Sequence, residues 1–389
     1  MTTTDTIYDE LCQLVATETV EAALDRLVEH LGRHKRWDDR FEARLLQSRL
    51  RLGLSLTEST SLDELPEPRR GEMEDAYLDA CREAGLAWLE AGDLRRGWTY
   101  MQPVGDKPAV AQWLARIEPD EEHLDTLIQI SVEGGVCPAL GMGLVLEHYG
   151  TCNAITLFQN TAATWSRLDQ TEVAACLVRH VHAELLENVK ADIVAREGHA
   201  PQGTFVQWIA KRNELFAEQN YHLDASHLAA VVRFARLFEQ PRDLRLAFDL
   251  TEYGRRLDPL YQFAGEEPFA DTFADHGLFF QALLGDAVDA ATEAFGRKAR
   301  ELSVEQHGTA AIEAYVTLLA RLGRYDDAIE AAITLFPRGA GPAASAPSLL
   351  WLASHSGHFE AMLESCRQRD DVVGFVAGLV EEKHSANRR

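Results

Sequence analysis

The stretches LLARLGRYDDAIEAAITLF, residues 318–336, and WLASHSGHFEAMLESC, residues 351–366, decide the fold. Their glycines, Gly323 and Gly357, stand 34 residues apart. On both sides of each glycine, apolar residues recur at spacings of three and four, which is the pattern of an amphipathic helix. Each stretch therefore predicts two helices joined by a short turn, and the glycine is expected to end the first helix.

Weaker copies of this pattern occur elsewhere, around Gly92 in WLEAGDLRRGWTYM, around Gly285 in LLGDAVDAATEAF, and at Trp37 in KRWDDRFEARL. In the two stronger copies an aromatic residue follows the glycine, Tyr325 or Phe359. The 34-residue period and the glycine–aromatic order resemble the tetratricopeptide repeat. The copies are unevenly spaced, and the Trp, Leu and Pro positions of that family are mostly unfilled.

The resemblance implies a solenoid of antiparallel helix pairs, an α/α superhelix whose concave surface binds a peptide, a protein or an extended ligand. The remaining sequence agrees with an all-α fold, because apolar residues recur at helical spacing nearly everywhere and alternating segments typical of strands are almost absent. We expect three regions: repeat-like pairs in residues 1–118, a central helical region in 119–285 and repeat-like pairs in 286–389. The stretch RGAGPAASAP, residues 338–347, predicts a flexible connection between the last two pairs.

Composition limits the possible partners. The chain has 38 Lys and Arg residues against 62 Asp and Glu residues, a formal net charge of -24. Such a field repels phosphate backbones and anionic lipid headgroups, so we expect neither nucleic acid nor membrane as a partner. An acidic surface suits a basic segment of a protein partner.

The expected location is the cytoplasm. The six cysteines show no CxxC spacing, which is typical of thiols in a reducing compartment. The opening MTTTDTIYDELCQL lacks the basic and apolar parts of a signal peptide, and no apolar window is long enough to span a membrane.

The central region holds eight of the fourteen histidines, several of them near carboxylates. His180 and Glu184 are four residues apart, and Asp224 and His227 are three apart, so each pair shares one side of a helix. Such pairs can supply nitrogen and oxygen ligands to a divalent metal ion. The predicted ligand set is His148, His180, Glu184, Asp224, His227 and His276, with Tyr149 or Tyr221 as a nearby proton donor.

Two of these pairs also have a purely structural interpretation. His180 and Glu184 can form a hydrogen-bonded pair on a solvated face. Asp224 can cap a helix that begins near Ala225, which would make His227 an ordinary first-turn residue.

Two further segments are open in the same way. EHYGTCN, residues 147–153, either lines a pocket or forms a corner in which Gly150 ends a helix. In GEEPFADTFADHGLFF, residues 265–280, Pro268 predicts the start of a helix, and acidic residues are favourable in the first turns of a helix. His276 is either a metal ligand or a packed residue.

Two functions are compatible with these features. The expected one is a helical binding module for a protein, a peptide or an extended ligand. The alternative is a metal-dependent enzyme with its site in the central helices, whose catalytic residues the sequence does not identify. No nucleotide-binding loop, HExxH or GxSxG motif is present, and no organic cofactor is expected.

Overall fold

A computed structural model describes residues 3–57, 62–337 and 346–388. Throughout these residues the regular structure is helical and there is no strand, although a single isolated bridge joins Ala264 and Asp271. The prediction of an all-α protein is confirmed. None of the helices in this part of the chain is long and apolar enough to cross a membrane.

The helices form two compact units. Unit 1 comprises Met1–Gly150 and Thr161–Asp169, and unit 2 comprises Thr151–Asn160 and Gln170–Arg389. The boundaries predicted after residues 118 and 285 each fall inside a unit, and the three-region division stays a prediction.

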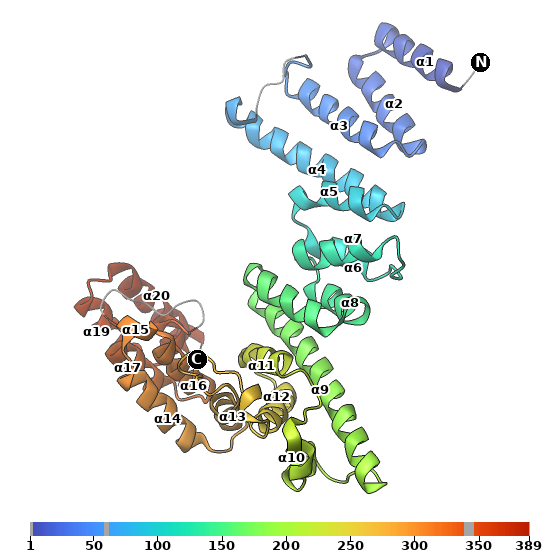
Figure 1. Cartoon of the computed structure of the whole chain (residues 1–389). Helices are drawn as coiled ribbons and strands as arrows, with labels where there is room; N and C mark the ends of the chain where they lie inside the picture. The colour runs from blue at the N-terminus through green and yellow to red at the C-terminus, as the bar shows by residue number, and fades with distance from the viewer. Residues whose placement is uncertain (1–2, 58–61, 338–345, 389) are drawn as a thin grey trace. The chain divides into compact units, whose positions relative to one another are not determined.

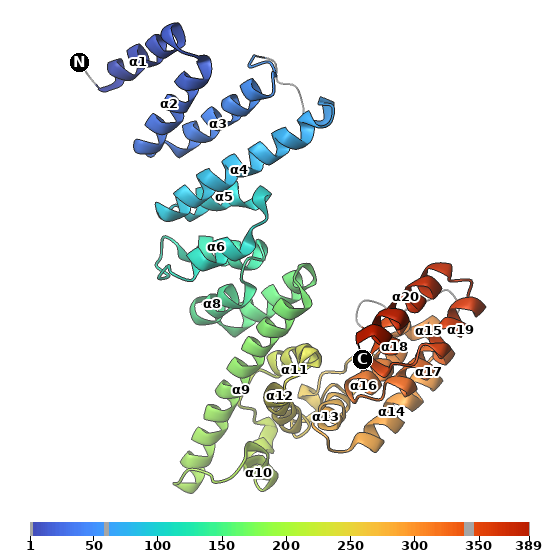
Figure 2. The same ribbon diagram turned by 180° about the vertical axis from the view of Figure 1, so that it is seen from behind.

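In unit 1, most helices pack against their neighbours in the chain. Figures 1 and 2 show α2, α3, α4 and α5 side by side in chain order. The elements are α1 (Thr3–Thr17), α2 (Val20–Arg33), α3 (Trp37–Arg51), η1 (Leu62–Glu64), α4 (Arg69–Glu90), α5 (Leu94–Val104), α6 (Lys107–Leu114), α7 (Leu124–Ile128), the π-helical turn η2 (Gln129–Glu133), the first part of α8 (Pro138–Thr161), η3 (Ala162–Thr164) and the start of α9 (Arg167–Glu197).

In unit 2, the same kind of neighbour packing joins α12 to α13, α16 to α17 and α17 to α18. The elements after α9 are α10 (Phe205–Ala210), η4 (Asn213–Gln219), α11 (Ala225–Phe234), η5 (Ala235–Leu237), α12 (Pro241–Gly254), η6 (Pro259–Tyr261), α13 (Thr272–Leu283), α14 (Val288–Glu301), α15 (Val304–His307), α16 (Ala310–Arg321), α17 (Tyr325–Leu335), α18 (Leu349–Ser356), α19 (Glu360–Gln368) and α20 (Val372–Arg388). Most of the connection predicted at residues 338–347 lies outside the described residues.

The predicted turns occur at the two strong copies. Gly323 ends the α16 turn with φ of 75° and Gly357 caps α18 with φ of 77°, both in the left-handed region that glycine adopts without strain. In the copy at Trp37, the equivalent position is Lys35, which has φ of 54°. This turn keeps its conformation without the glycine, which explains why the sequence pattern is weak there.

Helices α4 and α5 approach each other closely at two glycine positions. A Cβ built on Gly97 would lie 2.6 Å from Leu89 Cδ2 and 3.2 Å from the Leu89 backbone nitrogen, and one on Gly85 would lie 2.7 Å from Met101 Cγ. Helix α5 can therefore lie against α4 only because both positions lack a side chain. Gly97 follows Gly92 at the same offset at which Ala328 follows Gly323.

Equivalent aspartates connect successive helix pairs. Asp38, in α3, accepts hydrogen bonds from Trp88 Nε1 at 2.9 Å and from the Tyr100 hydroxyl at 3.0 Å. Asp326, at the matching position of α17, contacts His358 Nδ1 at 3.0 Å. The aligned positions of the two copies therefore make the same kind of contact with the following pair.

The helix predicted from Pro268 begins later than expected. Asp271 is its N-cap, because its side chain accepts a hydrogen bond from Ala274 N at 2.9 Å, and α13 starts at Thr272. The residues before Asp271 form a loop that places Phe269 beside α13.

Candidate functional site

The residues around Gly150 form a corner. Gly150 has φ of 82° and ψ of 172°, which breaks α8 between His148 and Thr151, so the corner interpretation of EHYGTCN is confirmed. Tyr149, one of the two predicted proton donors, donates its hydroxyl hydrogen to Asp125 Oδ1 at 2.6 Å. His148 belongs to unit 1, whereas the five other predicted ligands belong to unit 2.

Helix α9 carries His180 and Glu184, both exposed. His180 Nε2 lies 3.2 Å from the Thr151 hydroxyl oxygen. The next histidine, His182, faces another way and contacts Asp249 Oδ2 at 3.1 Å.

The pair Asp224 and His227 follows the capping interpretation. Asp224 Oδ1 accepts hydrogen bonds from Ser226 N at 2.8 Å and from His227 N at 3.2 Å, which defines it as the N-cap of α11. These bonds lower the pKa of the Asp224 carboxyl, led by the bond from the Ser226 side chain. Tyr221, the other predicted proton donor, is exposed and lies edge-on to the Tyr261 ring.

His276 is the most deeply buried of the predicted ligands, with 1% of its surface exposed. Its Nδ1 lies 2.6 Å from the Thr272 carbonyl oxygen, which can only accept, so Nδ1 carries the hydrogen. Burial, and then the charge of Arg236, lower the pKa of His276 to about 3. The ring is therefore neutral at physiological pH, with Nε2 as a buried acceptor that has no hydrogen-bond partner among the described residues.

In the described residues, no three His, Cys, Asp or Glu side chains lie together so that they could hold a metal ion. The six predicted ligands are distributed over α8, α9, α11 and α13. The metal site stays a prediction, and none of the contacts above supports it over the capping and packing roles.

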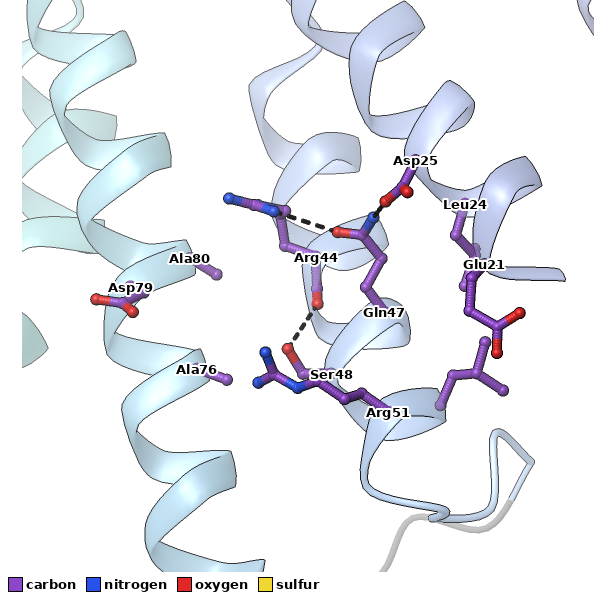
Figure 3. A pocket seen from close by; sticks show the side chains of 11 residues that line it. Glu21, Leu24, Asp25, Arg44, Gln47, Ser48, Arg51, Ala76, Asp79 and Ala80 are labelled. Carbon is purple, nitrogen blue, oxygen red and sulfur yellow. Dashed lines mark hydrogen bonds between the residues drawn. The ribbon is translucent and has the colours of Figure 1, made fainter. Parts of the chain in front are cut away.

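The structure contains a groove between α2, α3 and α4, which we call the N-terminal groove (Figure 3). It has a volume of about 360 Å³. Gln47 of α3 connects α3 to α2, since its Nε2 donates to Asp25 Oδ1 at 2.6 Å, and its Oε1 accepts from Arg44 of the same helix at 3.3 Å. It is lined by Glu21, Leu24, Asp25, Arg44, Gln47, Ser48, Leu50, Arg51, Ala76, Asp79 and Ala80.

A second groove lies between α17 and α19 in unit 2, and we call it the acidic groove. Its volume is about 420 Å³. Apolar side chains of α17 alternate there with carboxylates from both helices. It is lined by Asp326, Ile329, Glu330, Ile333, Thr334, His358, Ala361, Glu364, Ser365 and Gln368.

Some polar groups of the acidic groove have hydrogen-bonding partners among the described residues, and others do not. Asp326 contacts His358, and Glu364 accepts a hydrogen bond from Gln368 Nε2 at 3.1 Å. Nothing among the described residues pairs with the Glu330 carboxylate. The Ser365 hydroxyl is buried, at 3% exposure of the residue, and lacks a hydrogen-bond partner in the part of the chain that the structure describes.

The sequence did not single out Ser365 or Glu330, because each occupies an ordinary position of an amphipathic helix. The groove depends on the pairing of α17 with α19, whose residues are about 34 positions apart, so the repeat period was the one available signal.

No protein family model matches the chain, and no curated protein matches its sequence at a significant level. The likeness to the tetratricopeptide repeat therefore depends on the local features described above.

Proposed function

We propose that the chain is a binding module of the tetratricopeptide kind, in which helix pairs stack as a superhelix and the acidic groove holds a basic segment of a protein partner. The matched turns at Gly323 and Gly357, the Lys35 turn and the paired roles of Asp38 and Asp326 support the repeat interpretation. The superhelix is part of the proposal.

The observation that carries the proposal is the composition of the acidic groove. Ile329 and Ile333 provide an apolar lining, and Glu330 provides a carboxylate without a partner in the described residues. A Lys or Arg side chain has an apolar stem and a cationic end, and this combination matches such a groove. Ser365 lines the same groove, and its buried hydroxyl has no hydrogen-bond partner among the described residues, a condition that costs about 1–3 kcal/mol.

Titration calorimetry with blocked tetralysine and tetraglutamate peptides tests the proposal. We expect tetralysine to bind and tetraglutamate not to bind. Glu330→Gln should weaken tetralysine binding about two- to fivefold, the effect of one exposed ion pair.

Glu293→Gln is the matched control, because Glu293 is an exposed residue of α14 outside the groove and its loss removes the same charge. Equal weakening by both variants would show that tetralysine binds to the overall negative field. No binding of tetralysine to the wild-type chain would reject the proposal.

The alternative, a metal-dependent enzyme, is not proposed, because no observation on the described residues favours it over the binding module.

A further inference from the structure

Two arginines in unit 2 form an unneutralised cationic pair. Arg233 lies in the last turn of α11 and Arg236 lies three residues later in η5, so both project from the same side of the helix. In the described residues, no carboxylate forms an ion pair with either guanidinium.

The surroundings of the pair disfavour its charge. Desolvation lowers the pKa of Arg233, and desolvation together with the charge of Arg233 lowers the pKa of Arg236. Arg212, by contrast, has a raised pKa because it hydrogen-bonds to Glu197. Arg236 is nevertheless exposed to solvent, so it is recessed but accessible.

The pair is held in place by the protein. The Arg236 guanidinium carbon lies 5.0 Å from the centre of the Phe269 ring, a cation–π distance. Arg236 Nε also donates to the Arg233 carbonyl oxygen at 3.2 Å. The nearby Lys298 does not add a free cation, because it contacts Asp275 at 2.9 Å and Glu267 at 3.3 Å.

A buried hydrogen-bond acceptor belongs to the ring that stacks on Phe269. Phe269 stacks on His276 with ring centres 4.3 Å apart, and the nearby cations Arg236, Arg233 and Lys298 all lower the pKa of His276. The Nε2 of His276 is buried and has no hydrogen-bond partner within residues 3–57, 62–337 and 346–388. Because this Nε2 can only accept a hydrogen bond, a water or a ligand O–H, such as that of monohydrogen phosphate, can satisfy it, whereas a carboxylate oxygen cannot.

We propose that Arg233 and Arg236 form a binding site for an oxyanion, the carboxylate or phosphate group of a ligand, beside the Phe269–His276 stack. Guanidinium groups bind both anions through paired hydrogen bonds, and an anion here removes the repulsion between the two cations. The site shares no residue with the acidic groove and binds the opposite charge, so either proposal can fail without the other.

The test is titration of the whole chain with inorganic phosphate and, separately, with glutarate, at constant ionic strength. Heat of binding and the midpoint of thermal unfolding are both recorded. We expect at least one anion to bind and to raise the midpoint of thermal unfolding. Binding of phosphate would identify a phosphate group as the ligand's oxyanion, and binding of glutarate would identify a carboxylate.

Arg236→Gln should weaken that binding about tenfold or more, the effect of losing one charged hydrogen-bonding group. Arg245→Gln is the control, since Arg245 is an exposed arginine of α12 and its loss changes the net charge equally. Arg233→Gln replaces Arg236→Gln if the latter does not fold, as checked by circular dichroism. No binding of either anion, or equal weakening in the control and in the Arg pair variants, overturns the proposal.

Discussion

The buried imidazole of His276 makes the folded state sensitive to acid. Its pKa of about 3 in the folded chain lies below its ordinary value of 6.5, so the unfolded chain binds more protons between these pH values. Stability therefore decreases as the pH falls below 6.5. The expected decrease from this group approaches about 1.4 kcal/mol per pH unit.

The measurement is urea unfolding of the wild type and of His276→Asn at pH 7.0 and at successively lower pH. Asn can donate to the Thr272 carbonyl but does not titrate, so the variant should lose less stability on acidification. His384→Asn, at an exposed position of α20, should behave like the wild type. Parallel curves for all three chains would contradict the assigned role of His276.

Lys35 occupies a left-handed backbone position, at φ of 54°, that costs a non-glycine residue about 1 kcal/mol. Lys35→Gly should therefore raise the free energy of unfolding by about that amount. Lys35→Ala keeps the Cβ and should show no such gain. Chemical denaturation of the three chains measures the difference, and an equal response to Gly and Ala would remove the strain argument.

At the residue scale, features that depend only on neighbouring residues in the chain could be predicted from the sequence. Asp224 as a helix cap and Gly150 as a corner follow from the conformations of adjacent residues, and both are confirmed. The lack of an ion pair to Arg233 and Arg236 among the described residues could not be predicted in the same way. It depends on which carboxylates other helices bring near, although the absence of an acidic residue three or four positions from Arg233 was a visible signal.

The α4–α5 pair shows how one missing side chain sets the distance between elements. Gly97→Ala places a methyl group against Leu89 and its backbone, which should destabilise unit 1 by about 1–3 kcal/mol. Gly143→Ala is the control, since nothing lies within 4 Å of its Cβ and its φ is not positive. There a helix should gain up to about 1 kcal/mol, as judged by thermal unfolding.

The contact between successive pairs is tested at Asp38. Asp38→Ala removes the acceptor of the Trp88 and Tyr100 hydrogen bonds and should lower stability by about 1–2 kcal/mol. Asp39→Ala removes only an exposed ion pair with Arg36 in the same turn and should have a smaller effect. Denaturant unfolding followed by tryptophan fluorescence measures both, and similar losses would show that Asp38 contributes no more than a surface charge.

At the element scale, the helices and their turns could be predicted because periodicity and turn residues are local signals. The start of α13 was predicted too early, because Pro268 is compatible with a helix start, whereas the side chain of Asp271 places the cap three residues later. The close approach of α4 and α5 required knowledge of Leu89 and Met101, which face the glycines from the partner helix.

For the whole molecule, packing between chain neighbours predicts graded stability within each unit. In repeat-like arrays, terminal elements have one neighbour and open more readily than internal ones. We therefore expect amide hydrogen exchange in α1 to be faster than in α4 and α5, as measured by mass spectrometry. Uniform protection from α1 to α5 would instead indicate that unit 1 unfolds in one cooperative step.

The way the chain passes between the two units affects its translation and its evolution by recombination. The chain enters unit 2 at Thr151, returns to unit 1 at Thr161 and leaves it again after Asp169. During translation, unit 1 is incomplete until residues that follow the first segment of unit 2 have been made. Three breaks are needed to separate the units, so recombination at a single point of the coding sequence cannot exchange one of them intact.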